Sequence, residues 1–466
     1  MRAKLQIITG SALLSLLAAC AVGPDYHQPK TTVSAEFGRV GEAQYSTNTP
    51  LVQWWSSFND PLLIRLVQTA LTNNHDLRIA AANLNEARAL RRQAQFDLLP
   101  VPQATAGYTK EQLSPASFPG FTSQPLRASF FDAGFDALWE LDLFGRVRRS
   151  VESRTAAMEA SEASLEAVRV SLTSEIARNY FELRGLQNEL AVAYKNVTNQ
   201  QETVNITRAR LEGGRGTELD VARARSILNN TLAIIPPLET SVAEAIHRLG
   251  VLTGQQPTAL RAELTPPGSL PALPNVVNIG DPNELLRRRP DIRIAERNLA
   301  AATANIGVSV ADLFPRVTLN GQFGWEASNF SALGTANGEA WSFGPRITWA
   351  ALDLGHVRAR IQAANARAES YLAQYERTVL TSLEEAENAL VAFGREQQRL
   401  GYLQQSVADS RIAAVLARQR YDAGAVDFLV VLDAERAQLV TEDQFAQSQT
   451  RTATALVAVF KALGGS

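Results

Sequence analysis

The stretch Phe131 to Asp142, FDAGFDALWELD, decides the fold because two kinds of side chain alternate along it. Its odd positions carry Phe131, Ala133, Phe135, Ala137, Trp139 and Leu141, and its even positions include Asp132, Gly134, Asp136 and Glu140. Successive side chains of a β-strand point to opposite faces of the sheet. The pattern therefore predicts a strand with one apolar face and one acidic or small face.

Three further segments alternate in the same way, at residues 101–110, 317–326 and 341–349. Half-buried sheets of soluble proteins also show this pattern. Strands of about 10 residues with aromatic side chains on the apolar face are, however, the signature of a transmembrane barrel. Hydrophobic residues make up 45% of the chain, but beyond the N-terminal segment no apolar run is long enough for a spanning helix. We therefore expect any membrane insertion to use these strands.

Four strands cannot close a barrel, because the smallest membrane barrels have about eight strands and open edges are costly in lipid. The barrel must be shared between chains. Two chains would give a barrel filled with side chains, and three would give a wider barrel with a lumen. Acidic and small residues on the second face favour the wet lumen of three chains.

The chain also contains one pattern twice. DLRIA at 76–80 recurs as DIRIA at 291–295, and LDLFG at 141–145 recurs as LDLG at 352–355. Each half reads helix, strand, loop, strand, very long helix, glycine turn, helix. We expect the helices at 60–98, 146–212, 217–254, 282–313, 356–422 and 427–463. The two long helices would each measure about 100 Å, and Pro236-Pro237 should kink or break the helix at 217–254.

The N-terminus is typical of a secreted lipoprotein. Residues 1–19 combine basic residues, a short apolar run and small residues, which is the order of a signal peptide. Cys20 is the only cysteine, so no intramolecular disulfide can form. Leu17-Ala18-Ala19-Cys20 resembles the bacterial lipobox, which implies covalent diacylglycerol and an acyl chain on Cys20. Ala21 favours sorting to the outer membrane.

Enzyme chemistry is not indicated by the sequence. It contains no phosphate-binding GxxxxGK[ST] loop and no nucleophile elbow. The four histidines are scattered without the spacing of a metal site, at positions 27, 75, 247 and 356. The formal net charge of −2 gives no reason to expect nucleic-acid binding. We expect no cofactor, no metal and no catalytic residue.

The sequence resembles the TolC-like outer-membrane efflux factors, in the lipidated OprM-type (NodT) branch, over nearly all of the mature chain. The resemblance rests on CAVGPDY at 20–26, WWSSFNDPL at 54–62, WELDLFG at 139–145, RRRPDI at 287–292 and YDAG at 421–424. It implies a homotrimer with a 12-stranded barrel in the Gram-negative outer membrane, a periplasmic helical barrel, and a belt near its middle. It also implies two partners, a periplasmic adaptor and an inner-membrane resistance-nodulation-division transporter.

The resemblance divides the chain into a signal peptide (1–19), a lipidated segment of the equatorial belt (20–59), a first repeat (60–254), an equatorial linker (255–281) and a second repeat (282–466). The implied function is the exit duct of a tripartite efflux pump. Two alternatives remain, a duct for type I protein secretion and, from another class, a periplasmic structural coiled-coil lipoprotein. The latter requires that the four amphipathic strands be misread.

The resemblance also assigns residues at the periplasmic tip, where each long helix turns back. Leu429 matches an apolar gate ring, Asp433 matches an acidic ring, and Tyr421 matches a tyrosine that tethers neighbouring helices. Leu429 and Asp433 are four residues apart and share one helix face. From the residues themselves, Thr217 and Asp427 are expected N-caps, and Gly214 and Gly424 are expected at the turns.

Overall fold

The computed structural model describes residues 21–31, 33–34, 36–38, 45–46, 48, 53–114, 126–274 and 277–465. The expected signal peptide and Cys20 lie outside the described residues. The chain divides into two compact units. A sheet-containing unit comprises Met1–Lys30, Asn83–Glu162 and Ile294–Glu376. A mainly helical unit comprises Thr31–Ala82, Ala163–Arg293 and Arg377–Ser466. Each unit takes segments from both sequence repeats.

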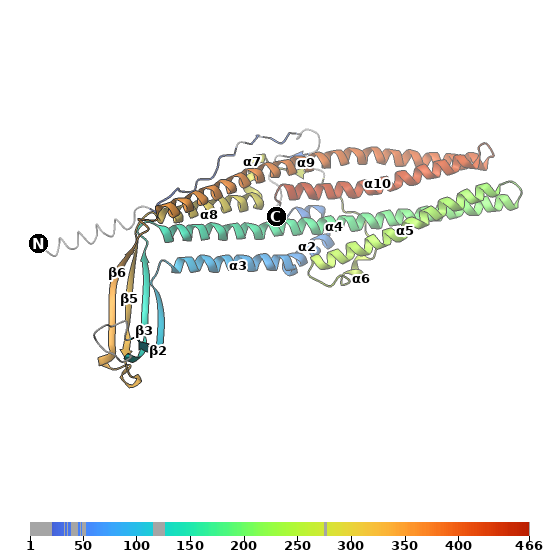
Figure 1. Ribbon diagram of the computed structural model, residues 1–466. Helices are drawn as coiled ribbons and strands as arrows, with labels where there is room; N and C mark the ends of the chain where they lie inside the picture. The colour runs from blue at the N-terminus through green and yellow to red at the C-terminus, as the bar shows by residue number, and fades with distance from the viewer. Residues whose placement is uncertain are drawn as a thin grey trace. The chain divides into compact units, whose positions relative to one another are not determined.

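The four expected strands form a single antiparallel sheet in the order β2-β3-β5-β6 (Figure 1). The strands are β2 (Val101–Leu113), β3 (Leu126–Leu141), β5 (Arg316–Ala327) and β6 (Glu339–Thr348). Strand β2 comes from the first repeat and β6 from the second, and each forms one edge of the sheet. The strand prediction is confirmed, and the structural coiled-coil alternative, which needed these strands to be misread, is wrong.

The register places the apolar positions of all four strands on one face. Phe135 is paired with Ala104 on one side and with Phe323 on the other, and Phe323 is paired with Trp341. The side chains of Phe135 and Trp341 are 62% and 74% exposed, so the described part of the chain leaves this face uncovered. The adjacent row, Gln103, Asp136, Gln322 and Ser342, is polar and lies on the opposite face.

The helical elements follow the same order in the two repeats. The first repeat contains α2 (Pro61–Asn73), α3 (His75–Phe96), α4 (Arg146–Glu212), α5 (Glu218–Leu252) and the single turn α6 (Arg261–Leu264). The second contains α7 (Pro282–Arg288), α8 (Pro290–Ala311), α9 (Leu354–Asp422) and α10 (Phe428–Ala462). Short elements are β1 (Tyr45–Ser46), β4 (Val277–Asn278) and the 3-10 turns η1 (Trp54–Phe58), η3 (Phe330–Ala332) and η4 (Ala336–Gly338).

Two expected helices are each divided in two, so the expectation of six helices is corrected. The helix at 60–98 is interrupted at Asn74, whose extended backbone ends α2 and whose side-chain oxygen accepts from the N–H groups of Asp76 and Leu77 in α3. The helix at 282–313 is interrupted at Arg289, because a residue before proline avoids the helical conformation. The interruptions are equivalent in the two repeats.

Of the kink or break expected at Pro236-Pro237, the break does not occur. Helix α5 continues through both prolines. Because proline has no N–H, the carbonyls of Leu232 and Ala233 lose their usual helical donors. The helix persists because α5 packs against its neighbours on both sides of the prolines, with Leu228 and Ile246 buried.

The core of the helical unit is an aromatic cluster that joins distant segments. Trp54 stacks on Phe460 with ring centroids 4.9 Å apart, and Phe58 meets Phe181 edge-on at 4.9 Å. All four rings are at most 4% exposed. Within this unit α5 lies along α4 and α10 along α9 (Figure 1), and ion pairs such as Arg411–Glu442 at 2.6 Å join the paired helices. Among the described residues, no helix has both the length and the apolar composition needed to cross a membrane.

Candidate functional site

The two helical hairpins end in turns of the same geometry. Gly214 and Gly424 adopt φ values of +68° and +73°, a region in which side chains with a Cβ are strained. In both turns the next residue, Arg215 or Ala425, donates its N–H to the carbonyl five residues earlier at 2.8 Å. This bond satisfies a carbonyl at the end of α4 and of α9. Glycine at these positions therefore allows the long helices to reverse direction.

The two helices that follow these turns begin differently. Thr217 forms a capping box, in which its Oγ1 accepts from the N–H of Asp220 and the Asp220 carboxylate accepts from the N–H of Thr217, both at 3.2 Å. Asp427 occupies the same position before α10, but its side chain accepts no capping hydrogen bond. The Asp427 main-chain carbonyl accepts the N–H of Val430 at 3.1 Å instead. The carboxylate of Asp427 is thus left at the surface of the tip.

Tyr421 lies at the junction of the two hairpins. The guanidinium of Arg210, in the last turn of α4, is 4.0 Å from the centre of the Tyr421 ring. The same guanidinium forms an ion pair of 2.9 Å with Asp422. On its other side the Tyr421 ring is 5.2 Å from Phe428, which is buried in the core of the hairpin tips. Tyr421 and Asp422 therefore connect the end of α9 to the end of α4.

Leu429 and Asp433 lie on the exposed face of α10. Val431 and Leu432, between them in sequence, are buried in the tip core, whereas the Leu429 side chain is 46% exposed. Among the described side chains, none forms a hydrogen bond or ion pair with Asp433. The pair therefore has an unpacked leucine and an unpaired carboxylate on one face, one helical turn apart. Val430, the next residue after Leu429, is also 46% exposed.

A polar contact that the sequence analysis did not single out joins α4, α9 and α10 above the tip. Arg418 of α9 forms an ion pair of 3.1 Å with Glu435 of α10, and it also bonds to the Thr203 hydroxyl of α4. The hydroxyl of Thr203 donates to Glu435 at 3.2 Å. Burial raises the pKa of Glu435, although the charge of Arg418 and the Thr203 bond act in the opposite direction. No local pattern marks these residues, because Thr203 lies 215 positions from Arg418 and 232 positions from Glu435.

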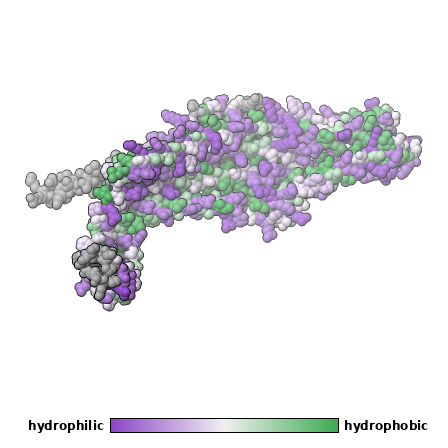
Figure 2. Space-filling view, in the orientation of Figure 1, coloured by the Kyte–Doolittle hydropathy of each residue, from purple (hydrophilic) through white to green (hydrophobic). Residues whose placement is uncertain are grey.

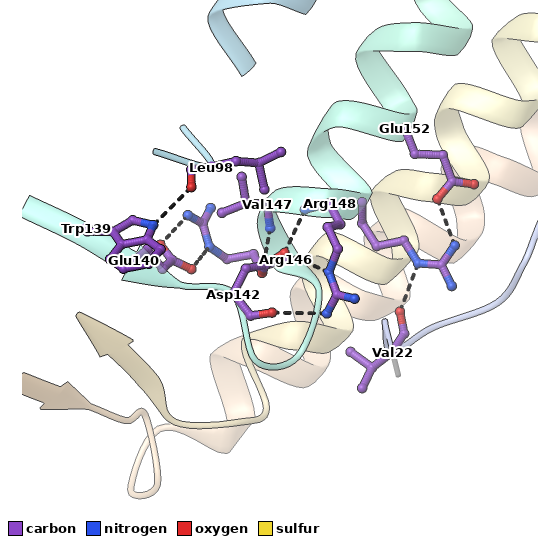
Figure 3. A network of polar contacts seen from close by, with 10 residues as sticks. Val22, Leu98, Trp139, Glu140, Asp142, Arg146, Val147, Arg148 and Glu152 are labelled. Atoms are coloured by element: carbon purple, nitrogen blue, oxygen red, sulfur yellow. Dashed lines mark hydrogen bonds and ion pairs between the residues drawn. The ribbon is translucent and has the colours of Figure 1, made fainter. Parts of the chain in front are cut away.

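The second conspicuous region is the junction between strand β3 and helix α4 in the sheet-containing unit (Figure 3). Asp142 directs its two carboxylate oxygens at the start of α4, where they accept from the N–H groups of Val147 and Arg148 at 2.9 Å. A negative group at a helix N-terminus is favourable. Arg146 forms a charge-assisted pair of 2.6 Å with Glu140 of β3. The LDLFG motif thus holds the start of α4 against the end of the strand.

A tryptophan fixes the strand end in both repeats. The indole N–H of Trp139 donates to the carbonyl of Leu98 at 3.0 Å, and the indole N–H of Trp349 donates to the carbonyl of Leu313 at 3.0 Å. Leu98 and Leu313 lie two residues after the ends of α3 and α8, at equivalent positions of the two repeats. The same bond therefore joins the helix end to the strand end twice.

The segment after Cys20 is attached to this junction. The N–H of Val22 donates to the carbonyl of Phe144 at 3.1 Å, and the buried Arg149 donates to the carbonyl of Val22 at 3.2 Å. Arg149 also forms an ion pair of 2.7 Å with Asp25. The chain that leads to Cys20 is therefore fixed next to the end of the sheet.

Metal and catalytic sites are not evident in the described part of the chain, which contains no group of three or more histidine, cysteine or carboxylate side chains able to hold a metal ion. What it contains is a sheet with an exposed apolar face and helical hairpins that end in an apolar and acidic surface. This combination defines the class as a channel-forming protein of a membrane.

Comparison with known proteins specifies the family. The model of the family described as "Outer membrane efflux protein" matches residues 66–255 and 282–465. The chain belongs to this family, whose members are efflux ducts rather than enzymes. The two matched stretches correspond to the two halves of the duplicated chain.

Individual relatives match nearly the whole chain. The toluene efflux pump outer membrane protein TtgI of Pseudomonas putida is 33% identical over 463 residues, which is 97% of this chain and 96% of that protein. Nodulation protein T of Rhizobium leguminosarum bv. trifolii is 32% identical, over 93% of this chain and 91% of that protein. The solved structure of the outer-membrane channel OprN is similar with a TM-score of 0.90 and 44% identity, covering 96% of this chain and 99% of that one. The fold and the general function, efflux through the outer membrane, are those of this family.

Proposed function

We propose that three copies of this chain form a passive exit duct, through which drugs or other solutes leave the cell. The observation that carries the proposal is the sheet itself. Among the described residues, strands β2 and β6 are unpaired at its two edges, one face is apolar and exposed, and the other is polar. In lipid such edges must be paired, and three copies would supply twelve strands around a polar lumen.

The duct would be closed at the hairpin tips by Leu429 and Asp433. Around a threefold axis, three leucines would form an apolar constriction and three aspartates an anionic ring that favours cations. The exposure of Leu429 and the absence of a partner for Asp433 within the described chain support this role. Tyr421 would hold the tip closed through its contact with Arg210.

The energy for transport would come from partners. The sequence has no nucleotide-binding loop, so we propose that an inner-membrane resistance-nodulation-division transporter supplies the substrate through a periplasmic adaptor. The chain itself would carry out no chemical reaction and need no cofactor. The name of the similar toluene efflux protein supports small-solute efflux rather than protein secretion.

Lipidation of Cys20 would anchor the duct. Val22 is hydrogen-bonded to Phe144 beside the end of the sheet, which supports an anchor on the part of the chain that would meet the outer membrane. A single acyl chain binds membranes only marginally, so the lipid would add to the hold of the strands. Intact-mass spectrometry of protein purified from membranes should show a diacylglyceryl group and an acyl chain on Cys20. An unmodified cysteine would remove the anchor from the proposal.

The assembly is tested by native mass spectrometry in detergent combined with recording in planar lipid bilayers. We expect a trimer that forms channels with small, cation-selective resting conductance. A folded monomer, or a trimer that never conducts, would contradict the duct. Protein with Cys20→Ser, secreted with a cleavable signal peptide, should still trimerise, which separates the barrel from the lipid anchor.

A further inference from the structure

A groove of about 510 Å³ lies between α4, α5 and α10 in the helical unit. Leu429 and Asp433 line its end near the hairpin tips. The opposite end is lined by Glu189, Leu238 and Asp443. Leu429 and Asp443 are 14 residues apart on α10, which corresponds to about 21 Å along the helix. The far end of the groove is therefore separate from the proposed gate.

Two carboxylates from different helices approach each other at this far end. Glu189 of α4 is half-buried, and in the described part of the chain no side chain forms a hydrogen bond or ion pair with it. Asp443 of α10 accepts from the amide of Gln447 at 3.0 Å. Burial, followed by the charge of Asp443, raises the pKa of Glu189 to about 7. Burial also raises the pKa of Asp443.

Apolar side chains lie exposed beside the two carboxylates. Ile234 of α5 is 53% exposed and Val440 of α10 is 50% exposed. Leu238 and Leu439 continue this surface along the groove. Figure 2 shows hydrophobic residues interrupting the hydrophilic surface of the hairpins. A carboxylate pair that forms no ion pair with any described side chain, next to uncovered apolar side chains, complements a molecule that is both positively charged and apolar.

The remaining charges around the groove do not neutralise this pair. Arg223 of α5 lies toward the tip, 15 residues before Leu238. Arg436 of α10 lies two helical turns before Asp443, which is about 10 Å along the axis. Arg451 lies on α10 beyond the groove and is exposed. Its charge lowers the pKa of Glu189 less than burial raises it. On α4 and α5 no other titratable side chain lines the groove.

We propose that the far end of this groove is a binding site for an amphiphilic cation, one per chain. Glu189 and Asp443 contact the positive group, and Ile234, Leu238 and Val440 contact the apolar body. A role of this site in transport, as a transient binding site for cationic solutes that pass through the duct, rests on the proposed function. The binding itself depends only on residues of one chain.

The test uses two probes of equal size and shape but opposite charge, tetraphenylphosphonium and tetraphenylborate. The full-length protein is placed in nanodiscs of uncharged lipid, and free probe is measured by equilibrium dialysis, with empty nanodiscs to subtract partition into lipid. We expect saturable binding of tetraphenylphosphonium, with one site per chain, at pH 8. Equal saturable binding of tetraphenylborate would overturn the proposal.

Variants locate the site. Glu189→Gln and Asp443→Asn should each weaken tetraphenylphosphonium binding by about fivefold, the upper range for a partly exposed ion pair. Ile234→Ser should weaken the binding of the cation while keeping both carboxylates. Glu202→Gln removes an exposed carboxylate from the same helix outside the groove and should leave the affinity unchanged. Parent affinity in both Glu189→Gln and Asp443→Asn would place the site elsewhere.

The pH dependence supplies a second readout. Because Glu189 loses its proton as the pH rises through about 7, binding to the parent should strengthen between pH 6 and pH 8, and Glu189→Gln should remove most of this change. If the protein binds the cation but forms no channels, the proposed duct is contradicted and the binding site stands. If it forms channels but does not distinguish the two probes, the binding site is contradicted and the duct stands.

Discussion

Arg210 in the last turn of α4 and Asp422 in the last turn of α9 form an ion pair of 2.9 Å, so the two sequence repeats are joined at the ends of their long helices. The two residues are 212 positions apart. Arg210 also covers the Tyr421 ring at 4.0 Å. The residue that the family pattern marks, Tyr421, is thus one member of a three-residue contact, and Arg210 is the member that reaches both others.

Removal of Arg210 should loosen the tip. An exposed ion pair contributes up to about 1 kcal/mol, so Arg210→Ala should raise the population of open tips, and with it the resting conductance, up to about fivefold. Recording in planar bilayers measures the change. The charge swap Arg210→Asp with Asp422→Arg should return the conductance toward the parent value. Equal conductance in parent, single variant and swap would show that the pair does not restrain the tip.

Leu429 and Asp433 should give separable effects on the channel. Leu429→Ala widens an apolar constriction and should enlarge the resting conductance, whereas Asp433→Asn removes the anionic ring and should reduce cation selectivity with less effect on width. Val430→Ala is the matched control, since Val430 is equally exposed, at 46%, on the neighbouring position. If Val430→Ala changes conductance as much as Leu429→Ala, the constriction is not specific to Leu429.

The regular parts of the fold could be predicted from the sequence because their signals are local. The alternation along β3 fixes which side chains share a face, and the structure pairs Phe135 with Phe323 on the apolar one. The bounds expected for the first long helix, 146–212, are those of α4. The internal duplication also helped, because each segment appears twice, and the copy with the clearer pattern identifies the copy whose pattern is less clear.

The departures had physical causes that the local sequence did not display. Asn74 looks like a polar surface residue of a helix, but it is only 4% exposed and its amide donates to the carbonyl of Leu252. Pro236 and Pro237 favour a helix break locally, but packing along α5 outweighs the lost hydrogen bonds. Glu189 could not be identified, because the charged residues that act on it, Asp443 and Arg451, lie on α10, far from α4 in the sequence.

The capping difference between the two hairpins predicts a difference in local stability. The side chain of Thr217 accepts a hydrogen bond from the first turn of α5, whereas the side chain of Asp427 accepts none from the first turn of α10. Thr217→Ala should therefore cost about 1 kcal/mol, and Asp427→Ala should cost much less. Hydrogen exchange of the amides in each first turn reports the local opening. Equal loss of protection in the two variants would contradict the difference in capping.

The unusual titration of Glu189 predicts how the stability of the protein depends on pH. The pKa of Glu189 is about 7 in the folded protein against 4.5 for an ordinary glutamate. Between these values the folded protein holds a proton that the unfolded chain has released. Stability should therefore fall as the pH rises from about 4.5 to 7 and change little from this group above pH 7.

Glu189→Gln isolates this contribution, because glutamine keeps the shape of the side chain but cannot ionise. A shift of this size corresponds to about 3 kcal/mol for a fully buried group, and partial exposure of Glu189 reduces the expectation to about 1 kcal/mol per chain. Thermal unfolding of the purified protein at pH 5, 6, 7 and 8 should show the variant gaining stability relative to the parent as the pH rises. Glu202→Gln, on the exposed side of the same helix, should follow the parent at every pH. If the curves of Glu189→Gln and the parent stay parallel from pH 5 to pH 8, Glu189 is ionised throughout and the helices around it leave it in contact with water.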